Sequence, residues 1–209
     1  WVETGSNVSS FYDPMIAKLI VWGKNREAAL TQMHHALSQF HVDGLGNNIA
    51  FLDRLVRCES FATANLDTGL IQREEAFLLG PQPQVSPELV VSAALTELLS
   101  RFANNKTANN PVWQTESLWR VNVNARYAVK FAINGIENVV HFTAQNQGYL
   151  AEYDGQSYTI SGQIMDAHHV KIELAGRKTN YAFSFSDSGL TVYDNGQSHH
   201  FAHIQPSFS

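Results

Sequence analysis

The sequence has few features that would support a disulfide-linked, nucleic-acid-binding or membrane-spanning protein. Its 209 residues include one cysteine, Cys58, so no disulfide can form within the chain, and a reducing compartment is the simplest interpretation. Lys and Arg form no cluster, and the formal net charge is −5. No apolar run approaches the roughly 18 residues that a membrane-spanning helix requires. We therefore expect neither a nucleic-acid partner nor a membrane partner.

The remaining composition is that of a folded protein with one or two domains. Hydrophobic residues make up 44% of the chain and charged residues 16%, which allows a sizeable core and argues against disorder. The chain begins at Trp1, without a methionine, in what looks like the middle of a strand. We interpret it as a fragment of a longer polypeptide, so the absence of a targeting signal carries little information.

Strand and helix patterns alternate in the first part of the chain, up to about residue 83. Residues 15–22 form a short apolar run, rich in β-branched side chains, that predicts a buried strand. Asn25 suits a helix N-cap, and apolar residues at spacings of three and four predict a helix that ends near residue 40. A short strand and turn at residues 41–44 and a second helix at about 48–57 follow. This order is typical of an α+β fold.

A linker with Pro81 and Pro83 leads into a helix that we predict at residues 87–102. Ser86 can cap this helix, Pro87 fits its first turn, and Glu88 complements the positive end of the helix dipole. Its apolar residues cover most of its circumference: Leu89, Val90, Val91, Ala93, Ala94, Leu95, Leu98, Leu99 and Phe102. A helix this apolar must be surrounded by other parts of the protein.

Residues 118–204 show the alternation and the turns of an antiparallel meander. Turn dipeptides at residues 134–135, 154–155, 175–176 and 195–196 separate short runs of alternating polarity. About eight strands fit, and their closure into a barrel would remove the sheet edges. We predict that the bore of this barrel holds the helix of residues 87–102. The predicted fold class is thus α+β, with an α+β first part and an eight-stranded antiparallel barrel around a central helix.

Patterns of catalytic sites are weak. Three histidines near the C-terminus, His199, His200 and His203, are the best metal candidates, but no cysteine or close carboxylate completes a zinc site. Residues 44–48 lack the glycine and lysine pattern of a phosphate-binding loop. We predict no catalytic residue and no metal site, and we keep two alternatives: a barrel that binds a small ligand in its bore, and a metal-dependent enzyme.

Three segments of the first part resemble the C-terminal region of biotin carboxylase domains. They are residues 11–22 (FYDPMIAKLIVW), 42–52 (VDGLGNNIAFL) and 66–71 (LDTGLI). The chain is therefore identified as a member of the biotin-dependent acyl-CoA carboxylase α subunits. Residues 66–79 most resemble the α subunits that act on 3-methylcrotonyl-CoA; propionyl-, acetyl- and geranyl-CoA carboxylase α subunits are close alternatives.

The resemblance implies two domains and several partners. Residues 1–82 would end the biotin carboxylase domain, and residues 83–209 would form the BT domain, which contacts the carboxyltransferase β subunit. The parent protein would be an ATP-dependent ligase with biotin and Mg-ATP as cofactors, and its remaining biotin carboxylase and biotin carrier domains would be further partners. This chain would hold no cofactor and would be inactive alone. Its location would be the cytoplasm of a bacterium or the mitochondrial matrix of a eukaryote.

The resemblance also suggests which residues matter. Asp13 and Lys18 would give structural support near the rim of the parent's active site. Residues 103–117 would form a hook loop that grips the β subunit, and Pro111, Val112 and Trp113 are our predicted partner-binding residues, since exposed aromatic side chains often anchor interfaces. In the alternative, Trp113 and Trp119 fold back and close the end of the barrel.

Overall fold

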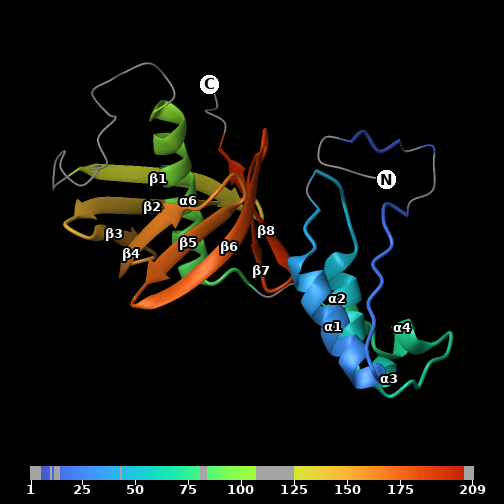
Figure 1. Cartoon of the computed structure of the whole chain (residues 1–209). Coiled ribbons are helices and arrows are strands. Elements are labelled where there is room, and N and C mark those ends of the chain that lie inside the picture. Colours follow the sequence, from blue (N-terminus) through green and yellow to red (C-terminus); the bar gives the residue numbers. More distant parts are fainter. Residues whose placement is uncertain are drawn as a thin grey trace. The chain divides into compact units, whose positions relative to one another are not determined.

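The computed structural model describes residues 6–9, 11, 15–42, 44–80, 84–106 and 125–204. The chain divides into two compact units (Figure 1). The first consists of residues 1–40 and 48–80, and the second of residues 41–47 and 81–209. Asp13, Pro111, Val112 and Trp113 lie outside the described residues, as do residues 107–124 as a whole.

The first unit is built from helices. Their bounds are α1 Arg26–Gln39, α2 Ile49–Arg57, α3 Glu59–Ala62, α4 Leu70–Arg73 and α5 Glu75–Leu78. The predicted N-cap is confirmed, because the Asn25 side chain accepts a hydrogen bond from the Ala28 backbone N–H at 2.9 Å. Sequence patterns gave α1 and α2 to within a few residues, but they did not indicate the three short helices that follow.

Two residues of α2, Asp53 and Arg54, make polar contacts that help to connect these helices. Asp53 of α2 is almost fully buried, and its carboxylate contacts His34 of α1 and Arg57 one turn further along α2. Arg54 donates to the backbone oxygen of Gly80 at 2.6 Å, beyond the end of α5. Each pairing satisfies a group that would be costly to bury alone.

The predicted strand at residues 15–22 is wrong as a secondary-structure assignment. Residues 15–23 run without helix or strand, and large apolar side chains project from them into solvent. Ile20 is 78% exposed and Trp22 is 82% exposed. A strand needs a neighbour for its backbone groups, and the described part of the first unit contains helices but no second strand. Of the short strand and turn predicted at residues 41–44, the described His41 and Val42 form no strand, whereas Gly44 has a left-handed φ of 79°, which suits a turn.

The predicted central helix is present as α6, Pro87–Lys106. The Ser86 hydroxyl accepts a hydrogen bond from the Leu89 backbone N–H at 3.3 Å, as a capping serine does. The helix is four residues longer than we predicted, so the first residues of the predicted hook loop are helical. Ala103 follows Phe102 directly and favours helix, and two asparagines were not enough to end it.

The predicted barrel is confirmed. Its strands are β1 Arg126–Ile133, β2 Ile136–Gln145, β3 Gly148–Tyr153, β4 Gln156–Ile164, β5 His169–Leu174, β6 Arg177–Ser186, β7 Gly189–Asp194 and β8 Gln197–His203. Each pairs antiparallel with the next, and β8 pairs with β1 to close the ring around α6 (Figure 1). Residues 118–124, which we assigned to the barrel, lie outside the described residues.

The four predicted turn dipeptides form the tight turns at one end of the barrel. In each, both residues have positive φ: 51° and 79° at Asn134 and Gly135, and 48° and 77° at Asn195 and Gly196. This pair of left-handed residues defines the hairpin turn whose twist matches that of the flanking strands. The register of β1 with β2, β3 with β4, β5 with β6 and β7 with β8 is thereby set locally.

Candidate functional site

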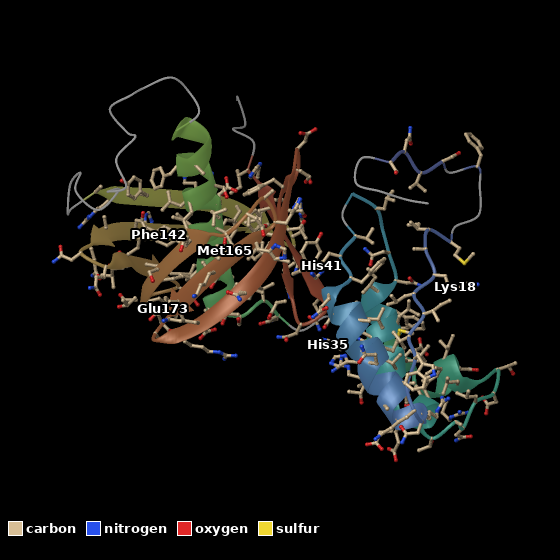
Figure 2. All side chains as sticks on the ribbon, viewed as in Figure 1. Lys18, His35, His41, Phe142, Met165 and Glu173 are labelled. Carbon is tan, nitrogen blue, oxygen red and sulfur yellow. The ribbon has the colours of Figure 1, made fainter. Side chains whose placement is uncertain are left out.

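The bore of the barrel is filled by the side chains of α6. Val91, Ala93, Ala94 and Leu95 have no solvent exposure, and they lie in one core with inward residues of the strands. Those inward residues are Val129, Phe131, Val140, Phe142, Ala151, Ile160, Val170, Ile172, Phe183, Leu190, Val192 and Phe201. The labelled Phe142 of β2 belongs to this core (Figure 2). A small barrel filled in this way has no room for a ligand.

The helix approaches strand β4 closely because Gly162 has no side chain. A Cβ atom at Gly162 would lie 2.8 Å from Cδ1 of Ile172 and 3.2 Å from Cδ2 of Leu95. A larger residue there would push the helix or the neighbouring strand away. The packing of α6 against the wall is therefore tight, which argues against the alternative of a small-ligand carrier.

The end of α6 and the start of β1 lie at the same end of the barrel. Phe102, near the end of α6, contacts Tyr127, near the start of β1, with ring centroids 5.2 Å apart. Residues 107–124 connect these two places in the sequence. Tyr127 contacts Tyr149, and Tyr149 contacts Phe142, so aromatic rings line this rim. Burial, with a smaller effect from Tyr127, raises the pKa of Tyr149.

Large apolar side chains are also exposed at this end. Met165, labelled in Figure 2, follows β4 and is 57% exposed. Phe185 of β6 and Ile204 after β8 are partly exposed too. Sequence patterns missed this set, because single apolar residues at the ends of strands continue the alternation of the strand. Their common location became visible only when the hairpins were placed side by side.

The three C-terminal histidines have separate partners. His203 Nε2 lies 3.6 Å from Oε1 of Glu97, and His200 Nδ1 lies 3.2 Å from the Thr191 hydroxyl. His199 is half-buried, and burial lowers its pKa, while Asp194 acts in the opposite direction. Across the described ranges, no three His, Cys, Asp or Glu side chains gather as a metal would require.

The remaining predicted site residue, Lys18, is described. It lies within residues 15–23, which form neither helix nor strand; its side chain is exposed, and it is labelled in Figure 2. The other predicted site residues, Asp13, Pro111, Val112 and Trp113, lie outside the described residues. Of the helices that the structure describes, none is long and apolar enough to cross a membrane.

Comparison with known families gives matches to both parts of the chain. Residues 1–73 match the model of the biotin carboxylase C-terminal domain. Residues 86–206, more than half of the chain, match the model described as methylcrotonyl-CoA carboxylase, alpha-subunit, BT domain. The chain belongs to this BT-domain family. The resemblance found in the sequence is thereby confirmed. The helix-filled barrel lies within the residues that match the BT-domain model.

Curated relatives of this BT-domain chain are much longer proteins. The mitochondrial methylcrotonoyl-CoA carboxylase subunit alpha of Dictyostelium discoideum is 39% identical over 132 residues, which cover 62% of this chain and 19% of the relative. The mitochondrial subunit alpha of Glycine max is 28% identical over 225 residues, covering 95% and 30%. The propionyl-CoA carboxylase alpha chain of Ruegeria pomeroyi is 37% identical over 95 residues, covering 44% and 14%. The chain thus spans less than a third of these relatives.

Proposed function

We propose that this chain is the part of a 3-methylcrotonyl-CoA carboxylase α subunit that docks the carboxyltransferase β subunit. Residues 83–209 act as the docking domain, and residues 1–82 complete the biotin carboxylase domain. The observation that carries the proposal is the filled bore: Leu95 and its neighbours on α6 occupy the space in which a ligand-binding barrel holds its ligand. A barrel without a cavity acts through its surface.

The chemistry of the whole enzyme then belongs to other parts of the parent protein. We propose that the parent uses biotin and Mg-ATP and that this chain holds neither cofactor and has no activity alone. Asp13 and Lys18 support the rim of the parent's active site without contacting reactants. The mitochondrial relatives support a matrix location in a eukaryote, whereas a bacterial source would place the protein in the cytoplasm.

The docking residues proposed here are Pro111, Val112 and Trp113. Their segment starts where α6 ends and returns where β1 begins, and the contact of Phe102 with Tyr127 holds these two points together. A segment anchored at both ends on a rigid barrel loses less conformational freedom on binding than a free tail does. The exposed Met165 and Phe185 at the same end would extend the contact area.

The experiment is a binding measurement with purified β subunits. The 209-residue chain should bind a methylcrotonyl-CoA carboxylase β subunit more tightly than a propionyl-CoA carboxylase β subunit, as measured by isothermal titration calorimetry. Trp113→Ala should weaken binding by about 2 kcal/mol or more, because tryptophans at interface centres contribute that much, and Val112→Ala should weaken it less. Circular dichroism should show unchanged thermal unfolding for both variants.

Trp22→Ala is the matched control, since Trp22 is an exposed tryptophan of the first unit. It should leave affinity for the β subunit unchanged. The docking proposal fails if neither β subunit binds, or if Trp113→Ala lowers affinity only in proportion to a loss of barrel stability. Tighter binding of the propionyl-CoA carboxylase β subunit would keep docking but would change the acyl-CoA.

A further inference from the structure

Among the described residues, the seam that closes the barrel, which is the pairing between β1 and β8, has fewer residue pairs than the other strand pairings. Strands β1 and β2 pair eight residues, and β7 and β8 pair six. Within the described residues, β1 and β8 pair only two: Phe131 with His203, and Ala132 with Ala202. The other described residues of β8 form no pair with β1 in the described part of the chain. Contacts of side chains near these two pairs are therefore of interest for how the barrel closes.

A buried carboxylate lies beside the seam. Glu97 on α6 is 7% exposed, although carboxylates are rarely buried unless they are paired. Its Oε1 accepts a hydrogen bond from Nε of Arg101 at 2.9 Å and lies 3.6 Å from Nε2 of His203. Its Oε2 is buried and has no hydrogen-bond partner. Oε1 thus contacts both the Arg101 guanidinium and the His203 imidazole, whereas Oε2 has no hydrogen-bond partner.

His203 connects four elements at this point. Its backbone N–H donates to the Ser188 carbonyl before β7 at 2.9 Å, and it pairs with Phe131 of β1. Its side chain reaches Glu97 on α6. Phe131 also packs edge-on against Phe201, two residues before His203 on β8, with ring centroids 5.2 Å apart. The last residue of β8 is therefore fixed to both neighbouring strands and to the helix inside them.

We propose that Glu97 is a latch that keeps the β1–β8 seam closed by holding the end of β8 onto the central helix. Its function is to specify barrel closure, and it adds little to overall stability. The unsatisfied Oε2 is the cost of this arrangement, because a buried unpaired oxygen is unfavourable. Replacing buried ionic groups by apolar groups of similar size is often neutral or stabilising, whereas a polar group in a core can select one arrangement. This inference holds whether or not the docking proposal does.

Two variants of the full chain separate a latch from an ordinary core residue. Glu97→Gln keeps the size of the side chain and removes its charge. Glu97→Met keeps an unbranched side chain of similar length and removes the unsatisfied oxygen. Amide hydrogen exchange, read by mass spectrometry, would compare peptides of the seam, covering residues 126–133 and 197–203, with the β3–β4 hairpin. Glu88→Gln is the matched control, because Glu88 is an exposed glutamate on the same helix.

Both Glu97 variants should raise exchange of the seam amides by about tenfold, while exchange in β3 and β4 stays unchanged. The melting temperature of the Glu97→Met variant should be equal to or higher than that of the unsubstituted 209-residue chain. His203→Gln should reproduce the seam effect, and combining it with Glu97→Met should add little, since both remove the same contact. Glu88→Gln should change neither measurement.

Several outcomes would overturn the latch. Unchanged seam exchange in both Glu97 variants would mean that Glu97 does not hold the seam. Exchange that rises equally in all strands, together with a lower melting temperature, would make Glu97 an ordinary stabilising residue. Fully additive effects of Glu97→Met and His203→Gln would show that their contact is not the one that matters.

Discussion

At the scale of single residues, the four hairpin turns at one end of the barrel differ at their first position. Asn134, Asp154 and Asn195 have polar side chains that tolerate left-handed φ, whereas the fourth turn has Ala175 at φ 49°. Its Cβ makes this conformation unfavourable, and its side chain forms no hydrogen bond in compensation. Ala175 is exposed, so no packing explains an alanine at this place.

Ala175→Asn should therefore stabilise the protein. We expect a gain of about 0.5–1 kcal/mol in the free energy of unfolding, measured by urea denaturation, because Asn occupies the left-handed region more easily. The control is Ala182→Asn in strand β6, where no left-handed residue is required and Asn should reduce stability. A destabilised Ala175→Asn variant would contradict the turn argument.

His199 gives the barrel a specific sensitivity to acid. Burial lowers the pKa of its imidazole below the ordinary value, so the folded state favours the neutral ring. Above the unfolded pKa of about 6.5 both states are neutral and His199 has no effect on stability. As the pH falls below that value the unfolded state takes up the proton first, and stability is lost until the folded state is protonated too.

His199→Gln should consequently reduce the loss of stability between neutral and mildly acidic pH. The measurement is the free energy of unfolding at a series of pH values, for the unsubstituted chain and for the variant. His141→Gln is the control, because His141 is an exposed histidine on β2. The interpretation is wrong if both substitutions change the pH dependence to the same extent.

At the scale of elements, α6 shows how composition can specify a position in the fold. A helix with one apolar stripe would lie on a surface, but residues on several sides of α6 are buried, including Val90, Val91, Ala94, Leu95 and Leu98. The same reasoning could not give its last residue. Helix ends depend on a balance of small propensities, and here the balance favours four more helical residues.

Leu95→Asp should destabilise the barrel by about 3 kcal/mol or more, because it places a charge without a partner in the middle of the bore. Thermal unfolding followed by circular dichroism would measure the loss. Ile136→Asp is the control, since it makes a similar change at a side chain that is 70% exposed. It should alter stability by no more than about 0.5 kcal/mol. Similar melting temperatures for the Leu95→Asp variant and the unsubstituted chain would contradict the conclusion that α6 fills the bore.

At the scale of the whole molecule, the two units differ in how much they bury. The barrel has a continuous core that includes nineteen buried apolar residues. In the described part of the first unit, the buried apolar residues are Leu37, Cys58, Leu70 and Leu78. Apolar burial is the main source of stability, so the first unit has less to hold it together.

Amide hydrogen exchange should therefore be faster in the first unit. We expect α1 and α2 to exchange at least about tenfold faster than β3 and β4, because local opening needs less free energy where few apolar contacts are lost. Adding a high concentration of urea should equalise the two regions as the barrel also unfolds. Equal protection of both regions in native buffer would contradict the prediction.

The sequence by itself determined what depends on neighbouring residues. The left-handed turn residues, the Asn25 cap and the all-round apolar surface of α6 are local features, and they led directly to hairpins, a helix start and a helix inside a barrel. Family motifs in the same sequence indicated the carboxylase resemblance.

Tertiary structure decided what depends on residues far apart in the chain. Residues 15–22 have the composition of a strand but do not form one, because pairing requires a second strand, which composition cannot supply. Glu97 gave no sign of its role until closure of the barrel brought His203 to its carboxylate. Such contacts are set by strand order and register, and these follow from packing of the whole barrel, which no short stretch of sequence contains.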